Sequence, residues 1–297
     1  MTTLRVNGAR SASDAAKLPG VLHFQPAAEP AVPVVFDSPH SGTEYPLDFD
    51  HVVPVEKLRK AEDMYVDELF ASAPRHGASL IAALFPRSYI DPNRSLDDLD
   101  PELLADSWPE PVRPGEKARL GHGLVWRLCP PDMNLYAGKL AADDVRRRID
   151  EYWKPYHDQL LHVLNDMHRR FDSVWHVNCH SMPSLTRGSF LNGSGQVDFV
   201  LGDRDGTTSS PDFVHVVRDT LREFGYSVRV NDPYKGVELV RAYSNPPGGR
   251  HRLQVEINRA LYMNESTFER LPQFTDLRTN VDRLIALVCD FARDRTA

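Results

Sequence analysis

The chain has 297 residues, of which 41% are hydrophobic and 26% charged, a composition typical of a globular protein. Its formal net charge of -7 argues against broad nucleic-acid binding, although a locally positive pocket could still bind an acidic ligand. Three scattered cysteines, no secretory signal pattern and no apolar stretch of membrane-spanning length lead us to expect a cytoplasmic protein without membrane or nucleic-acid partners.

Strand and helix patterns alternate along the first half of the chain. Residues 1–30 are rich in Ala, Ser and Pro and are predicted to form a loose N-terminal arm or an edge segment. Residues 32–36 are typical of a buried strand that runs into a polar loop, and 79–84 predict a second strand. Apolar residues at helical spacing predict a helix over 56–73. The acid-rich and proline-rich residues 95–120 indicate a long loop or lid.

The second half continues this alternation. Helices are predicted at 139–170, where Pro155 is expected to kink or split the helix, and at 213–224 and 277–291. Strands are predicted at 173–179, 197–201, 226–230, 238–243 and 251–257. The order indicates an α/β fold with a mixed, mostly parallel central sheet and helices on both faces. No linker divides residues 31–297, so we expect a single catalytic domain.

Two histidines occupy equivalent positions at the ends of predicted strands, His40 and His180. Functional groups of α/β folds gather where strands end, and two imidazoles with a carboxylate and a water complete a catalytic zinc site. A strand-end histidine can also be a structural hydrogen-bonding residue. The sequence leaves the carboxylate open between Glu44, four residues after His40, and Asp63, at the margin of the apolar helix face. Asp63 could equally belong to a solvated acidic stripe.

Further polar residues suit the same chemistry. Glu256 lies on the polar face of an alternating strand and could be a general base, or it could simply line the exposed face of an edge strand. Arg94 beside Asn93 suits an anionic substrate, with Arg127 and Lys235 as weaker candidates. All three cations could instead form ordinary surface pairs.

A cysteine amidase using Cys179 is a mechanistic rival, since this thiol adjoins His180. Neighbouring residues on a strand point to opposite faces, which disfavours a nucleophile–base pair.

Five motifs occur in the order found in N-formylglutamate amidohydrolases, and the chain resembles this family from about residue 30 to 290. The motifs are residues 38–42 (SPHSG), 90–94 (IDPNR), 178–183 (NCHSMP), 231–236 (NDPYKG) and 254–258 (QVEIN). The resemblance implies a three-layer α/β/α sandwich related to zinc carboxypeptidases and aspartoacylases, with one Zn²⁺.

The resemblance also implies roles for individual residues. His40 and His180 match metal-binding histidines, Glu256 matches the general base, and Asn93 and Arg94 match a pair that holds a substrate carboxylate. Thr43 stands where the related peptidases place a glutamate ligand. Residues 62–64 (EDM) resemble a Thr-Asp-Trp-like stretch of the family, so the resemblance implies Asp63 as the acidic ligand, with Glu44 as the second choice.

The implied reaction is hydrolysis of N-formyl-L-glutamate to formate and glutamate, a late step of histidine degradation. The alternatives are hydrolysis of another N-acyl amino acid, an aspartoacylase-like activity, or an acidic-metabolite binding module without turnover. The sequence leaves the oligomeric state, the exact acyl amino acid and the native metal open.

Overall fold

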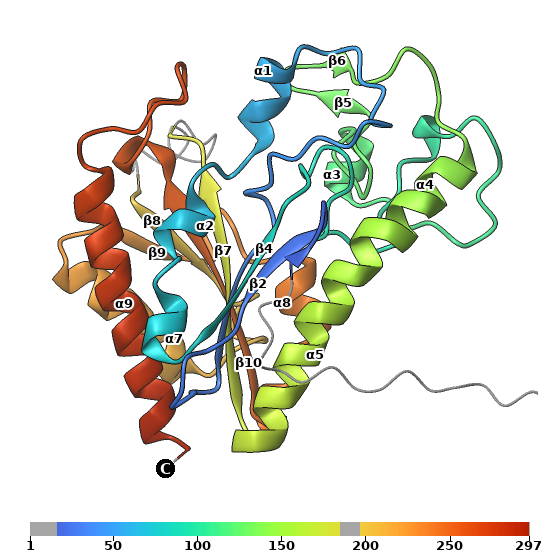
Figure 1. Cartoon of the computed structure of the whole chain (residues 1–297). Helices are drawn as coiled ribbons and strands as arrows, with labels where there is room; N and C mark the ends of the chain where they lie inside the picture. The colour runs from blue at the N-terminus through green and yellow to red at the C-terminus, as the bar shows by residue number, and fades with distance from the viewer. Residues whose placement is uncertain (1–16, 185–196, 297) are drawn as a thin grey trace, which may run out of the picture.

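A single eight-stranded sheet organises the molecule (Figure 1). The computed structural model describes residues 17–184 and 197–296. The strand order is β1-β2-β4-β3-β7-β10-β8-β9. The strands are β1 (Lys17–Leu18), β2 (Leu22–Gln25), β3 (Val34–Ser38), β4 (Ser79–Ala83), β7 (Val174–Met182), β8 (Phe199–Gly202), β9 (Val228–Val230) and β10 (Arg250–Asn258). The central strands β4, β3, β7 and β10 are mutually parallel, whereas β2 and β8 join them antiparallel.

Helices cover both faces of this sheet (Figure 1). On one face α9 (Phe274–Asp294) packs beside α7 (Pro211–Glu223) and α2 (Val66–Leu69). On the other face α5 (Lys154–Phe171) crosses β3, β4 and β7, and α8 (Glu238–Ala242) contacts β7 and β10. The predicted three-layer α/β/α sandwich with a mixed, mostly parallel sheet is therefore confirmed.

The remaining short elements lie mainly in the connections. They are α1 (Val55–Leu58), η1 (Arg59–Ala61), η2 (Ala73–His76), η3 (Pro101–Leu103), α3 (Glu116–Arg119), the hairpin β5 (Leu128–Cys129) and β6 (Met133–Asn134), α4 (Ala142–Arg148), the π-helical turn η4 (Ile149–Trp153), η5 (Pro246–Gly248) and η6 (Arg259–Leu261).

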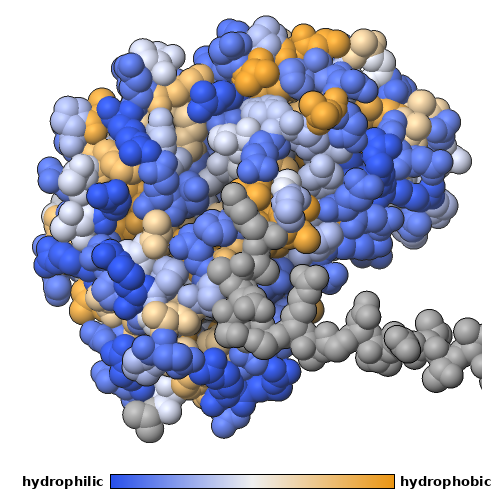
Figure 2. Space-filling model, viewed as in Figure 1, coloured by the Kyte–Doolittle hydropathy of each residue, from blue (hydrophilic) through white to orange (hydrophobic). Residues whose placement is uncertain are grey.

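None of the described helices combines the length and the apolar character that crossing a membrane requires. Figure 2 shows hydrophilic residues over most of the viewed face, with apolar patches between them.

The two faces of β7 differ in chemistry although the whole strand is buried. Val177 and Cys179 belong to the apolar core beneath α9. The alternate residues His176, Asn178 and His180 are also buried, on the opposite face toward α5. Buried polar side chains require hydrogen-bond partners inside the protein, so this face carries an internal polar network.

Two element predictions need correction, whereas β1 and β2 make residues 17–25 an edge segment of the sheet and residues 1–16 lie outside the described part. Residues 238–243, predicted as a strand, contain the helix α8. The predicted helix over 56–73 is broken into α1, η1 and α2.

The long predicted helix at 139–170 is present as α4, η4 and α5 in succession. The helix does not end at Pro155, but its regular geometry is interrupted directly before this residue, which lies in the first turn of α5. The π-helical turn at Ile149–Trp153 directly precedes it.

Candidate active site

The carboxyl ends of the three central strands β3, β7 and β10 bring the predicted site residues together. His40 lies two residues beyond β3, while His180 and Glu256 lie near the ends of β7 and β10. Gly42 allows the loop after β3 to pass against β4, since a Cβ there would collide with the carbonyl oxygen of Phe85.

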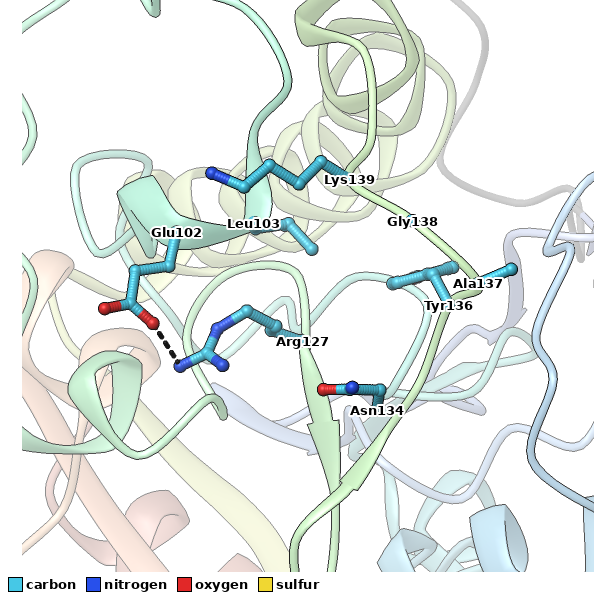
Figure 3. Close-up of a pocket in the computed structure, with 8 residues that line it drawn as sticks. All are labelled: Glu102, Leu103, Arg127, Asn134, Tyr136, Ala137, Gly138 and Lys139. Carbon is cyan, nitrogen blue, oxygen red and sulfur yellow. Dashed lines mark ion pairs between the residues drawn. The ribbon is translucent and has the colours of Figure 1, made fainter.

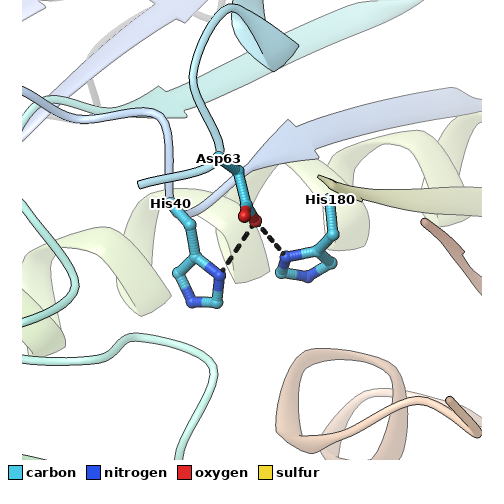
Figure 4. Close-up of side chains that lie close together, drawn as sticks. All are labelled: His40, Asp63 and His180. Atoms are coloured by element: carbon cyan, nitrogen blue, oxygen red, sulfur yellow. Dashed lines mark hydrogen bonds and ion pairs between the residues drawn. The ribbon is translucent and has the colours of Figure 1, made fainter. Parts of the chain in front are cut away.

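The side chains of His40, Asp63 and His180 converge on one point (Figure 4). One ligand atom from each lies within 4.8 Å of the others, and all three residues are buried. Asp63 Oδ2 is 3.3 Å from His40 Nδ1 and 3.0 Å from His180 Nδ1. Burial alone would raise the pKa of Asp63, but the hydrogen bonds and charges of the two histidines outweigh it and lower that pKa. This group could hold a metal ion.

The far nitrogen of His40 shows why a cation fits between these groups. His40 Nε2 lies 2.7 Å from Asp91 Oδ1, and Asp91 also accepts hydrogen bonds from Arg87 Nε and Nη2. A carboxylate held ionised by a guanidinium only accepts, so Nε2 carries the proton. Nδ1 faces the Asp63 carboxylate, a contact that needs positive charge between the two groups, supplied either by a proton on Nδ1 or by a metal ion that both groups coordinate.

Asp63 reaches the site because the chain leaves helical geometry around it. Its backbone N–H donates to the carbonyl oxygen of His40 at 2.9 Å, and Tyr65 adopts a left-handed φ of 65°. Asp63 Oδ1 accepts hydrogen bonds from Ser181 Oγ at 3.2 Å and Arg259 Nη2 at 3.1 Å. Glu44, the alternative acidic ligand, is exposed and is not part of the cluster that the described residues form.

Glu256 is the neighbour of His180 across the β7–β10 pairing, and its side chain is buried. Gln254 Nε2 donates a 2.8 Å hydrogen bond to Glu256 Oε1, which orients the carboxyl group. Burial raises the pKa of Glu256 to about 7, the charge of Asp63 adds to this, and that of His180 opposes it. A carboxyl group with this pKa can exchange a proton near neutrality.

Arg94 and Asn93 flank the same site. Asn93 Nδ2 lies 3.0 Å from His180 Nε2. The Arg94 side chain is only 8% exposed, and its Nε is 3.4 Å from the carbonyl oxygen of His122 and 3.7 Å from Asp98 Oδ2. Neither Nη atom of Arg94 donates a hydrogen bond to a described residue. These free donors suit a bidentate anion.

Arg127 and Lys235 lie elsewhere. Arg127 is paired with Asp100 at 2.6 Å and Glu102 at 3.1 Å, and it lines a separate cavity of about 510 Å³ (Figure 3). Lys235 is 57% exposed and pairs with Asp205 at 2.9 Å. Among the described residues, no hydrogen bond or ion pair joins either cation to His40, Asp63 or His180.

The sequence prediction missed two other cations near the cluster. The charges of Arg87 and Arg259 both act on Glu256. Each guanidinium nitrogen of Arg259 donates at least one hydrogen bond, to Ser181, Asp63 or a backbone carbonyl oxygen, whereas Arg87 Nη1 donates none to a described residue. For Arg87, the only sequence signal is its position four residues before Asp91, a spacing that suits the ion pair between these two residues.

The location of Cys179 disfavours the cysteine mechanism. Its thiol belongs to the apolar core on the face opposite His180, and its hydrogen bond goes to the carbonyl oxygen of Val177. Burial raises the pKa of Cys179 well above its usual range. A buried neutral thiol is a poor nucleophile.

The chain matches a known protein family over most of its length. Residues 32–263 match the family model described as N-formylglutamate amidohydrolase. Relatives named N-formylglutamate deformylase from Pseudomonas putida and Pseudomonas aeruginosa are 26% and 27% identical, over 79% of this chain and 83% of each relative.

Two solved structures are also similar to the chain. The structure of N-formylglutamate amidohydrolase from Ralstonia eutropha JMP134 is 45% identical, with a TM-score of 0.88 over 93% of this chain and 99% of that chain. A gene product of Agrobacterium tumefaciens shares the fold at 16% identity and a TM-score of 0.62, over 92% of this chain and 96% of that chain.

Proposed function

Because the chain belongs to the N-formylglutamate amidohydrolase family, we propose that it hydrolyses N-formyl-L-glutamate to formate and L-glutamate with one bound zinc ion. The convergence of His40, Asp63 and His180 on one point is the observation that carries this proposal. The names of the Pseudomonas and Ralstonia relatives support the substrate. The role in histidine degradation follows from the same substrate.

The three converging residues would hold the metal through two imidazole nitrogens and one carboxylate oxygen. This donor set, with a position left for water or substrate, is typical of catalytic zinc. When bound, the ion would polarise the formyl carbonyl and make water more acidic. The hydrogen bond of His40 Nε2 to Asp91, and that of Asp63 Oδ1 with Arg259, keep the ligand atoms directed inward.

Glu256 is proposed as the general base. Its carboxylate removes a proton from the attacking water, and the same group can return that proton to the amine of the departing glutamate. Hydrolysis therefore leaves the carboxylate unchanged after each turnover. The hydrogen bond from Gln254 and the pKa near 7 both suit a group that alternates between the two protonation states.

Arg94, with Asn93 beside it, is proposed to bind one carboxylate of the substrate. The free Nη atoms of Arg94 and its low exposure make the pairing strong, because little water competes. Arg87 is better placed than Arg127 or Lys235 to serve a second anionic oxygen, since its charge already acts on Asp63 and Glu256. Arg127 and Lys235 each have acidic partners of their own.

The direct test is formate release from N-formyl-L-glutamate by the purified chain, before and after metal removal. We expect turnover that disappears with the metal and returns with added zinc. Faster hydrolysis of acetylaspartate would instead support an aspartoacylase-like activity. Metal binding without hydrolysis of any acyl amino acid would support a binding module.

A further inference from the structure

The segment that carries Asn93 and Arg94 has no regular secondary structure. Residues 89–94 follow β4 along the chain and form neither helix nor strand. The carbonyl groups of such a segment have no ladder of their own, so those that are buried need hydrogen-bond donors from elsewhere in the protein. The positions of both side chains therefore depend on the groups that hold this backbone.

Two aromatic side chains at the start of α5 hold the segment. Trp153 Nε1 donates a 3.0 Å hydrogen bond to the carbonyl oxygen of Arg94. His157 Nε2 lies 2.7 Å from the carbonyl oxygen of Pro92, and because a carbonyl oxygen only accepts, this nitrogen donates. The two rings stack, with centroids 3.5 Å apart and planes inclined by 17°, so each ring helps to fix the other.

His157 keeps this arrangement across the pH range in which the protein is folded and active, because it stays neutral. Burial lowers the pKa of His157 to about 4. A neutral ring carries one proton, which Nε2 donates to Pro92, so Nδ1 accepts from the hydroxyl group of Tyr243. Both ring nitrogens are therefore satisfied, and the ring has one fixed orientation.

The π-helical turn η4 explains how donors far apart on the helix face the same segment. The elements α4, η4 and α5 form one continuous helix (Figure 1). Arg148, the last residue of α4, donates from Nη1 to the carbonyl oxygen of Tyr89 at 3.0 Å. Arg148 precedes Trp153 by five residues, the spacing of a π-helical turn, and Trp153 precedes His157 by four, the spacing of an α-helix. The three donors therefore line up along one face of the helix.

We propose that Trp153 and His157 are positioning residues, which set the backbone of residues 92–94 and thereby place the guanidinium of Arg94 and the amide of Asn93 at the substrate. Their side chains act through this backbone and are assigned no contact with the substrate. The link to substrate binding rests on the proposed function, whereas the placement of the segment does not.

A double-mutant cycle between Trp153 and Arg94 tests the proposal. Trp153→Phe keeps a ring for the stack and removes the indole donor. We expect kcat/KM for N-formyl-L-glutamate to fall roughly 10- to 100-fold, mainly through KM, with the zinc content unchanged. In an Arg94→Ala background the same change should alter kcat/KM by no more than about twofold, because the group that Trp153 positions is already absent.

Tyr152→Phe is the matched control in the same π-helical turn. Its ring packs against Tyr89, and its hydroxyl group forms no hydrogen bond with a described residue. Its kcat/KM should match that of the wild type within about twofold. If Trp153→Phe does not fold, His157→Phe takes its place in the cycle, since it removes the second donor and keeps a ring in the stack.

Equal losses in both backgrounds would overturn the proposal, because they would show a general effect on the fold, and so would an unchanged kcat/KM in Trp153→Phe. If Arg94→Ala leaves no measurable turnover, the crystal structure of Trp153→Phe decides. A displaced backbone at residues 92–94 would support the proposal, and an unmoved one would overturn it. This structure needs no substrate, so it still decides if the wild type does not hydrolyse N-formyl-L-glutamate, a result that would contradict the proposed function instead.

Discussion

Glu256 on β10 is paired with His180 on β7 in the parallel register, so the proposed base and a proposed metal ligand project side by side from the same face of the sheet. Both residues are buried, and the charge of His180 lowers the pKa of Glu256 against the effect of burial. Side chains on neighbouring central strands are held by the main-chain ladder on both sides. Such placement favours a fixed geometry between the base and the metal.

Glu256→Gln should lower kcat while leaving the metal in place. The variant keeps the shape of the side chain and removes the basic oxygen. A positioned general base contributes roughly 10²–10⁴-fold, so kcat should fall by that order. Metal content by elemental analysis accompanies the kinetics, and a variant with near-normal kcat would exclude this role.

The rate of hydrolysis should rise with pH across the acid side of neutrality. Burial raises the pKa of Glu256 to about 7, and the base acts only as the carboxylate, so the active fraction grows as pH increases. A bound cation stabilises the carboxylate and lowers this pKa, so the midpoint of kcat/KM should lie at or below about 7. A rate that falls over the same range would contradict the assignment.

Removing the metal with a chelator should abolish activity. The variant His180→Ala should lose the metal, because the two ligands that remain hold zinc poorly. Cys179→Ala is the matched control at the adjacent position, on the opposite face of β7. It should keep most activity, although it leaves a small cavity in the core. Complete inactivity of a folded, metal-loaded Cys179→Ala would revive the thiol mechanism.

N-formylglutamate should be hydrolysed better than N-formylglutamine if both substrate carboxylates meet cations. A neutral side chain would leave a buried charge unpaired, a loss of about 2–5 kcal/mol in kcat/KM. Arg94→Lys should also be costly, because an ammonium group cannot reproduce the bidentate guanidinium.

Lys235→Ala is the control for this prediction and should change kcat/KM little, since its exposed pair with Asp205 is worth under about 1 kcal/mol. Equal rates for the charged and neutral substrates would rule out recognition of the side-chain carboxylate.

The sequence predicted the fold well because the hydrophobic pattern of each central strand is a local property. The segments that end near His40, His180 and Glu256 have the pattern of apolar residues, followed by polar residues, that is typical of buried strands. The strand predicted at 238–243 failed because a short apolar run fits either a strand or a helix. There α8 packs against β7 and β10, and tertiary contacts decided the conformation.

The helix predicted over 56–73 is broken close to Asp63, the proposed acidic metal ligand. Regular helical geometry would leave Asp63 at the margin of the apolar face, whereas the observed break turns it inward beside both histidines. Local pattern rules fail most often where function imposes another conformation. The hydrogen bond from Asn178 to Asp37 joins two strands that are distant in sequence, so no local pattern indicates it.

Metal stoichiometry of Asp63→Ala and Glu44→Gln tests the central claim most directly. Elemental analysis of the purified, zinc-loaded proteins should give one ion per chain for the wild type and for Glu44→Gln, whose side chain is exposed. Asp63→Ala should retain almost none, because it removes the carboxylate that joins His40 and His180. One ion per chain in a folded Asp63→Ala, or none in the wild type, would contradict the account.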